Sequence, residues 1–413
     1  MIQDILTRMS GIFFSRLLTF ITSLLVARMV SEEDWGHIGL IMSYFSLLLV
    51  FSGNMFTRAI VTYTAQVKDD IASTGKILFM GNRLNIVASL ITIISGYAIL
   101  QLFNPISDKI AEKTLMIIMP CILIVILSQN IISYFQGRGD LKYVTMLELF
   151  RSIVISSIVI ISINIFSEPF HGWISGRIIG LIIVLVLFMV ILWIKFRIHF
   201  FHWSVDNAEI YAKMKKYFLW AFISAFFSVA VRSLDVIIIS EFYHDNTLTG
   251  IFKLSIIFFT AFGLFGQSIT SALYHRFAQL ESKTDMLYRL SLKIKLFSIP
   301  IYSVIAIILL VLSDDLLSIL FNDKYYLLHE VIKVIIVASI FQIYIFINGG
   351  IWSAIGDMKL NTQFFTVYSI TYILFLIFTM IKFEFVMFPY AILAVTIFGA
   401  IYSEILLRKR LLS

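Results

Sequence analysis

The sequence predicts an all-α polytopic membrane protein with twelve transmembrane helices in two six-helix lobes. Hydrophobic residues make up 60% of the chain and charged residues only 14%, whereas soluble domains carry about a quarter charged residues. Apolar stretches long enough to cross a bilayer recur along the whole chain. In addition, a short pattern in the first half returns at the corresponding place in the second half. Together these observations exclude a soluble globular protein.

The apolar stretches, taken in order, predict twelve helices. An even number of helices puts both termini on one side of the membrane. Lysine and arginine are concentrated in the connections on that side, and the opposite connections hold only Lys109, Lys113, Lys324 and Lys382. By the positive-inside rule, both termini are expected in the cytoplasm. The predicted spans are 11–30, 36–58, 84–103, 114–136, 147–167, 173–195, 217–240, 251–275, 296–313, 331–353, 363–382 and 388–407.

An internal repeat predicts how these helices are grouped. The turn after the fourth helix reads Gly139-Asp140-Leu141-Lys142, and the turn after the tenth reads Gly356-Asp357-Met358-Lys359. Six helices separate the two turns, so the repeats have the same topology and are expected about a pseudo-twofold axis along the membrane normal, with a cleft between them. The predicted lobes are residues 1–205 and 206–413. The turns themselves have a structural explanation, since glycine ends one helix and aspartate caps the next; a hinge is the alternative.

Several classes of function lack support in the sequence. The chain has no GxxxxGK[ST] phosphate loop, no HExxH and no GxSxG pattern. Its single cysteine, Cys121, excludes an intramolecular disulfide framework. The net charge of +7 is explained by attraction to the inner membrane surface, and no nucleic-acid module is present. The N-terminus lacks a cleavage site, so the first helix is expected to be a mature span. We therefore predict a non-enzyme without metal or cofactor, acting within the membrane.

Charged residues inside the predicted spans point to an anionic ligand. Arg16 lies inside the first helix and has no acidic residue three or four positions later, where Thr19 and Phe20 stand. A guanidinium in hydrocarbon is costly, so it is expected to face a wet cavity or a partner. The spans and their edges hold more basic than acidic residues, and arginine binds phosphate oxygens with paired hydrogen bonds. The basic residues are Arg16, Arg28, Arg151, Arg177, Arg232, Lys253 and Lys333, and the acidic ones are Glu148, Asp235 and Glu404.

Most of these charges also have a structural explanation. Arg28 can pair with Glu32, and Arg151 with Glu148, because each pair is three or four positions apart on one helix. Arg232 and Asp235 form either a structural pair or a site for a coupling ion. Three others, Arg177, Lys253 and Lys333, lie about a turn from a span end, where interfacial anchoring is favoured. Arg16 is thus the first candidate for ligand contact.

The sequence resembles a known family of transporters. The stretches Ala27–Gly36 (ARMVSEEDWG) and Phe135–Asp140 (FQGRGD), with the twelve-helix length, resemble the polysaccharide transporters of the MOP exporter superfamily, and within them the O-antigen (Wzx-type) flippases. The resemblance implies a V-shaped pair of lobes around a cationic cavity in the bacterial inner membrane. It implies translocation of undecaprenyl-pyrophosphate-linked oligosaccharide repeat units to the outer leaflet, by antiport with protons or sodium. It also implies an O-antigen polymerase and a chain-length regulator as partners.

The resemblance and the charged residues inside the predicted spans together predict the residues of the substrate site. Superposing the two halves of the sequence sets Arg16 near Arg232, and we expect both to bind the pyrophosphate. Arg177 or Lys253 is expected farther along the path, and Asp235 is the expected protonation site that acts on Arg232.

Three other functions remain open. A multidrug exporter of the same superfamily would share the fold, but its cationic substrates are disfavoured by a positive interior. An oligosaccharide polymerase is expected to need a sizeable outer loop, whereas no predicted connection exceeds about 25 residues, below the size of a usual domain. A peptidoglycan-precursor flippase is expected to have two further helices.

Overall fold

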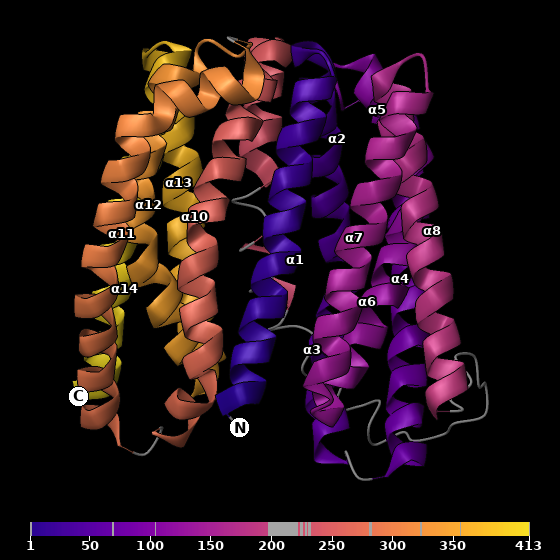
Figure 1. Ribbon diagram of the computed structural model, residues 1–413, viewed down its shortest axis with the longest axis vertical. Helices are drawn as coiled ribbons and strands as arrows, with labels where there is room; N and C mark the ends of the chain where they lie inside the picture. The colour runs from indigo at the N-terminus through magenta and orange to yellow at the C-terminus, as the bar shows by residue number, and fades with distance from the viewer. Residues whose placement is uncertain are drawn as a thin grey trace. The chain divides into compact units, whose positions relative to one another are not determined.

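The computed structural model describes residues 2–67, 70–103, 105–196, 222–223, 226–227, 229, 233–280, 283–322, 324–355 and 357–412 (Figure 1). Within these ranges all regular secondary structure is helical. They contain nine helices long and apolar enough to cross a membrane, or ten when the bent pair Lys109–Ile118 and Cys121–Arg138 is taken as one span. The predicted all-α, multi-span membrane fold is confirmed.

The chain divides into two compact units. The first unit comprises Met1–Val30 and Leu40–Val229, and the second comprises Ser31–Gly39 and Ala230–Ser413. The segment 31–39 follows the first helix in sequence but packs with the second unit, where Glu32 Oε1 accepts a hydrogen bond of 3.2 Å from the backbone N–H of Tyr325. The predicted lobe boundary between residues 205 and 206 lies outside the described residues.

The helices of the first unit follow one another with short connections. They are α1 (Ile2–Met29), α2 (Glu32–Phe51, which starts in the segment of the second unit), α3 (Asn54–Gln66), α4 (Ile71–Phe103), α5 (Lys109–Ile118), α6 (Cys121–Arg138), α7 (Leu141–Ile165) and α8 (Pro169–Phe196). The second unit contains α10 (Asn246–Gln279), α11 (Thr284–Phe321), α12 (Leu328–Ala354), α13 (Met358–Lys382), the 3-10 turn η1 (Phe385–Met387) and α14 (Phe388–Leu412).

Two predicted spans are not single straight helices. The span predicted at 36–58 is α2 followed by α3, because Gly53 has a φ of 96°, a left-handed conformation that glycine adopts without steric cost. The span predicted at 114–136 bends by 48° between α5 and α6, at Pro120. Proline has no N–H to donate to Met116, four residues earlier. The Tyr97 hydroxyl donates to the Met116 carbonyl instead, at 2.6 Å, so that this carbonyl stays paired.

Other helices extend beyond the predicted ranges. α4 begins at Ile71 rather than near residue 84, and α11 begins at Thr284 rather than near residue 296. Hydropathy marks only the part of a helix that lies in hydrocarbon, whereas the backbone hydrogen bonds continue through polar residues until a breaker or cap ends them.

In the repeated turns, Gly139 and Asp357 have the roles expected for them, Asp140 does not, and Gly356 lies outside the described residues. Gly139 ends α6 in the left-handed conformation, with a φ of 79°. Asp357 precedes α13 and its carboxylate accepts a hydrogen bond from the backbone N–H of Leu360 at 3.1 Å. The two turns differ in one respect. The carboxylate of Asp140, which precedes α7, accepts from Arg138 Nε at 3.0 Å rather than from a backbone N–H.

In the first unit, α7 packs between α1 and α8 (Figure 1). Small hydroxyl side chains join α1 to α7. The hydroxyls of Ser15 and Ser152 are 2.6 Å apart, and Thr22 donates to Ser156 at 2.7 Å. Ser15 also lies 3.1 Å from the backbone carbonyl of Glu148, to which its hydroxyl donates. Such side chains let two membrane helices approach closely and satisfy their own polar groups.

Glycines join α7 to α8 on its other side. Gly172, Gly176 and Gly180 follow one another at intervals of four residues, so they lie on one face of α8. A Cβ at Gly176 would lie only 2.7 Å from Val159 Cα, and one at Gly172 would lie 2.6 Å from the Ser162 carbonyl oxygen. The two backbones are therefore in direct contact, and α7 holds α8 at a fixed register.

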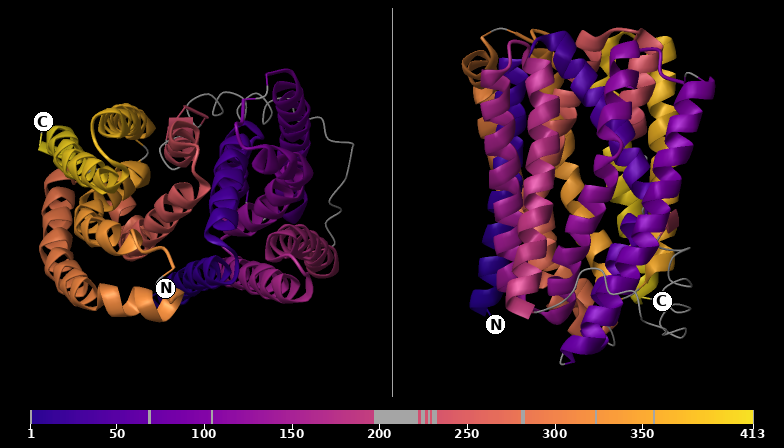
Figure 2. Two further views of the ribbon diagram at one scale, coloured as in Figure 1. Left: turned by 90° about the horizontal axis from the view of Figure 1, so that it is seen from above. Right: turned by 90° about the vertical axis from the view of Figure 1, so that its right-hand side faces the viewer.

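The second unit is organised around α12, which packs against α10, α11 and α14. Buried residues of these helices and α13, including Tyr302, Ile347, Trp352, Phe364 and Leu407, form one apolar cluster. Figure 2 shows α11 curving along the outside of this unit, and the helix contains Pro300, which removes one backbone hydrogen bond.

The glycine contact between α7 and α8 can be tested by a substitution that adds one methyl group. Gly176→Ala is expected to lower the midpoint of thermal unfolding in detergent, because overpacking at a backbone contact costs about 1–3 kcal/mol. Gly349→Ala is the matched control, since nothing lies within 4 Å of a Cβ at this helical glycine. There the midpoint is expected to rise slightly, because alanine favours a helix by about 0.5–1 kcal/mol over glycine. Equal effects at both positions would contradict the packing described.

Candidate functional site

Arg16 lies on α1 next to Ser15, whose hydroxyl contacts Ser152 of α7. Its neighbour Ser15 is buried against α7, whereas Arg16 itself is exposed. Its guanidinium interacts electrostatically with Glu148 of α7. Arg16 is therefore a cation at the exposed edge of the contact between α1 and α7.

Arg151 of α7 lies next to Arg16. It interacts electrostatically with both Glu148 and Arg16. Its Nη1 donates a hydrogen bond of 2.9 Å to Oε1 of Gln129 on α6, which fixes the direction of the guanidinium. The sequence predicted a pair between Arg151 and Glu148, but Glu148 is shared between two arginines.

Arg177 of α8 continues the same group of cations. It interacts electrostatically with Arg151, and its guanidinium carbon lies 6.0 Å from the centre of the Trp173 ring. The Nε atom of Arg177 is buried and has no hydrogen-bond partner among the described residues. A buried donor without an acceptor costs free energy, and an anion would satisfy it.

We call Arg16, Arg151 and Arg177 the arginine cluster. Glu148 is the acidic residue that interacts electrostatically with Arg16 and Arg151. Gly176 is in contact with Val159, so Arg177 lies near the level of residue 158 on α7. At 1.5 Å per residue, Arg177 is roughly 10 Å farther along the unit than Arg151. Three guanidinium groups against one carboxylate leave an excess of positive charge at two depths within the helices, which suits a multiply charged anion.

The site residues predicted in the second half differ from the arginine cluster, because an acidic residue lies beside the described cation. Arg232 lies outside the described residues, as does its expected pairing with Asp235. Asp235 is buried and accepts a hydrogen bond of 3.0 Å from the hydroxyl of Tyr372 on α13. It also interacts electrostatically with Lys253 of α10. The aliphatic stem of Lys253 packs on Gly39 of α2, where a Cβ would lie 3.1 Å away. Lys253 therefore has an acidic neighbour and belongs to a balanced pair.

Sequence reasoning ranked Arg16 first and anticipated Arg177, but it set Arg151 aside. The signal that could have found Arg151 is the row of small hydroxyl residues on each helix: Ser15 and Thr22 of α1 pair with Ser152 and Ser156 of α7. Matching these faces would have brought Arg16 and Arg151 to the same level. Helix pairing of this kind cannot be read from hydropathy.

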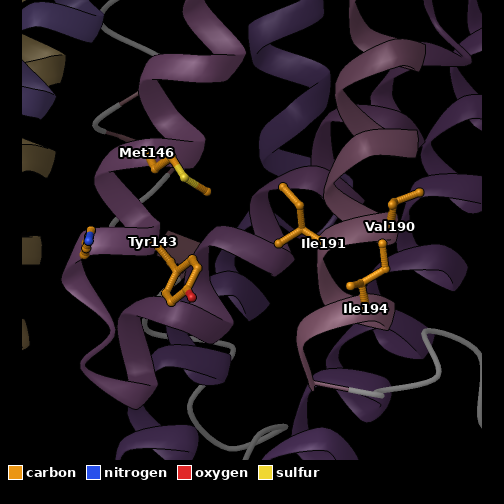
Figure 3. Close-up of a pocket in the computed structure, with 6 residues that line it drawn as sticks. Tyr143, Met146, Val190, Ile191 and Ile194 are labelled. Carbon is orange, nitrogen blue, oxygen red and sulfur yellow. The ribbon is translucent and has the colours of Figure 1, made fainter.

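A surface hollow between α7 and α8 is separate from the arginine cluster (Figure 3). It is lined by Tyr143 and Met146 of α7, by Val190, Ile191 and Ile194 of α8, and by Lys142. Its apolar lining and its partly exposed Met146, Val190 and Ile194 fit a hydrocarbon chain better than a charged group.

The role of Glu148 as counter-charge can be tested by neutralising it. Glu148→Gln is expected to lower the midpoint of thermal unfolding, because two arginines lose their acidic neighbour. The loss should be well below the roughly 3–5 kcal/mol that breaking a fully buried pair costs. Asp314→Asn, which removes an exposed carboxylate 2.8 Å from Lys333, is the control and should have a much smaller effect. An unchanged midpoint in Glu148→Gln would show that the arginines do not depend on it.

Comparison with solved structures identifies the fold. The inward-facing structure of a multidrug resistance MATE family transporter of the MOP superfamily matches with a TM-score of 0.81 and 10% sequence identity, covering 98% of each chain. An outward-facing structure of such a transporter matches with a TM-score of 0.78 and 11% identity, over 99% of this chain and 96% of that one. A mutant of the MATE transporter VcmN from Vibrio cholerae matches with a TM-score of 0.73 and 11% identity, over 99% and 97%.

Comparison of sequences identifies the family. A search of curated proteins returned no match. The family model described as "Polysaccharide biosynthesis protein" matches residues 1–281, which is more than half of the chain and includes the whole arginine cluster. With the fold of the MOP-superfamily transporters, this chain belongs to the polysaccharide biosynthesis protein family.

Proposed function

We propose that the protein is a flippase that moves undecaprenyl-pyrophosphate-linked O-antigen repeat units from the cytoplasmic to the periplasmic leaflet of the bacterial inner membrane. The observation that carries this proposal is the arginine cluster, in which Arg16 and Arg151 share the carboxylate of Glu148 and Arg177 interacts with Arg151. Membership of a polysaccharide biosynthesis family and a transporter fold support it. An O-antigen polymerase and a chain-length regulator are the partners that this function would require.

The chemistry of the substrate explains why such a cluster is useful. A pyrophosphate-linked sugar carries negative charge and many hydroxyl groups, and exposing these to hydrocarbon is costly. Arg16 and Arg151 would bind the pyrophosphate first, with Arg177 as a second contact farther along. The prenyl tail would remain in lipid, and the apolar hollow on α7 and α8 offers it a surface.

A multidrug antiporter is the main alternative, since MATE transporters share the fold. Organic cations require acidic or aromatic lining. In the second unit the buried carboxylate of Asp235 is already occupied by Tyr372 and Lys253, and in the first unit Glu148 is outnumbered by arginines. This charge balance favours an anionic substrate. An oligosaccharide polymerase is less well supported, because the chain has the fold of solved transporters.

The first test is genetic. Deletion of the gene in its own host should abolish surface O-polysaccharide, with lipid-linked repeat units accumulating on the cytoplasmic leaflet. Wild type should restore export, whereas Arg16→Ala should reduce it roughly 10- to 100-fold, because each lost hydrogen bond to a charged group costs about 1.5–3 kcal/mol. Arg28→Ala, an exposed arginine in the last turn of the same helix, is the matched control. If single repeat units still reach the surface unpolymerised in the deletion strain, the protein is a polymerase and the proposal is wrong.

The second test measures binding directly. Inorganic pyrophosphate should raise the thermal unfolding midpoint of the purified wild-type protein, because a ligand that binds only the folded state stabilises it. Arg16→Ala and Arg151→Ala should each weaken or remove this rise, and Arg28→Ala should preserve it. A rise of equal size in all four proteins would show that pyrophosphate binds elsewhere.

A further inference from the structure

One uncharged polar side chain lies beside the arginine cluster. Gln129 of α6 accepts a hydrogen bond of 2.9 Å from Nη1 of Arg151. A guanidinium group has five N–H donors and no acceptor, so the atom of Gln129 that faces it must be the carbonyl oxygen Oε1. The amide cannot be turned round without losing this bond. The direction of its other polar atom, Nε2, is therefore fixed as well.

The Nε2 atom of Gln129 is an unused hydrogen-bond donor. It has no hydrogen-bond partner among the described residues, and it stays accessible, because Gln129 is only half-buried. An amide nitrogen carries two N–H groups and does not accept hydrogen bonds. Gln129 therefore presents an uncharged donor next to the charged donors of Arg151.

The hydroxyl groups on the neighbouring face of α1 are used in helix packing. The Ser15 hydroxyl donates to the Glu148 carbonyl at 3.1 Å and lies 2.6 Å from the hydroxyl of Ser152. One turn later on α1, the Thr19 hydroxyl donates to the Ser15 carbonyl at 3.0 Å. These bonds hold α1 together and join it to α7. The amide nitrogen of Gln129 is a neutral donor that the packing of these helices leaves free.

The charged and the uncharged donors suit different parts of a pyrophosphate-linked sugar. Guanidinium groups form their strongest hydrogen bonds with ionised phosphate oxygens. The sugar bonded to the pyrophosphate instead offers neutral oxygen acceptors, which a neutral donor satisfies. The prenyl tail on the other phosphate has nothing to accept a hydrogen bond and remains in lipid. A neutral donor fixed beside Arg151 is therefore suited to the sugar side of the pyrophosphate.

We propose that Gln129 determines specificity by donating a hydrogen bond from Nε2 to a neutral oxygen of the first sugar, the one attached to the pyrophosphate. Arg151 binds the adjacent phosphate, and its bond to Gln129 keeps the charged and the neutral donor at a fixed spacing. A sugar without an acceptor at this place would leave Nε2 unpaired and bind less tightly. The inference rests on the proposed function, and it adds a contact to the sugar.

The test compares two probes that differ only in the sugar. They are hexyl pyrophosphate and hexyl pyrophosphate carrying a hexose, with glucose, galactose and N-acetylglucosamine tried in turn. Dissociation constants are measured by calorimetric titration of the purified full-length protein, and the ratio of the two constants gives the contribution of the sugar. For at least one hexose, the wild type should bind the sugar-bearing probe roughly 2- to 10-fold more tightly, the range expected for one hydrogen bond between uncharged groups.

Gln129→Glu separates the roles of the two amide atoms. The carboxylate keeps an acceptor for Arg151 but has no N–H donor, so the ratio should fall to about one. Its charge weakens both probes alike and cancels from the ratio. Because the carboxylate pairs with Arg151, the thermal unfolding midpoint without ligand should rise. Stability and sugar binding then change in opposite directions, which a purely structural role would not produce.

Gln136→Glu, the same change two turns later on α6, is the matched control and should keep the wild-type ratio. An equal loss of the ratio in this control would overturn the sugar contact. So would a wild-type ratio of one for every hexose, or an unchanged ratio in Gln129→Glu, and these results would leave pyrophosphate binding by the arginines intact. If the wild type binds neither probe, the arginine cluster is not the substrate site, and the proposed function loses its main support together with the sugar contact.

Discussion

The close contact of α7 with both α1 and α8 determines where the charges of the first unit lie. On one side the backbones are separated only by hydroxyl side chains, and on the other by glycine hydrogen atoms. Small residues allow membrane helices to approach closely, and close approach fixes their rotation and register. Arg16, Arg151 and Arg177 are therefore brought together by neighbours that carry no charge, one from each of three helices.

The two units share a repeated turn but differ in the charge balance of their described intramembrane residues. In the first unit, the described arginines outnumber the carboxylate that acts on them. In the second unit, the described intramembrane carboxylates each have a lysine neighbour: Asp235 is near Lys253, and Glu404 is bonded to Lys295. An excess cation can bind a substrate anion, whereas a balanced pair offers no net charge to one.

The sequence predicted the fold class, because composition and apolar run length are direct consequences of a lipid environment. It named Arg16 and Arg177 as candidate contacts for the substrate, and this role stays a prediction. It did not predict the break at Gly53 or the bend at Pro120, since a hydropathy average is insensitive to single residues of special backbone geometry. It placed Arg151 in a simple pair with Glu148, because spacing along one helix reveals neighbours on that helix only. The Lys295–Glu404 pair joins residues 109 positions apart and could not be found by spacing.

The most direct measurement is a comparison of substrates with the purified protein in liposomes. A fluorescent prenyl-pyrophosphate-linked oligosaccharide and an organic cation of the multidrug class would be offered in parallel. We expect the anionic lipid to cross between leaflets at a rate that depends on Arg16, and the cation not to be transported. Transport of the cation without movement of the lipid would identify a multidrug antiporter and rule out the flippase.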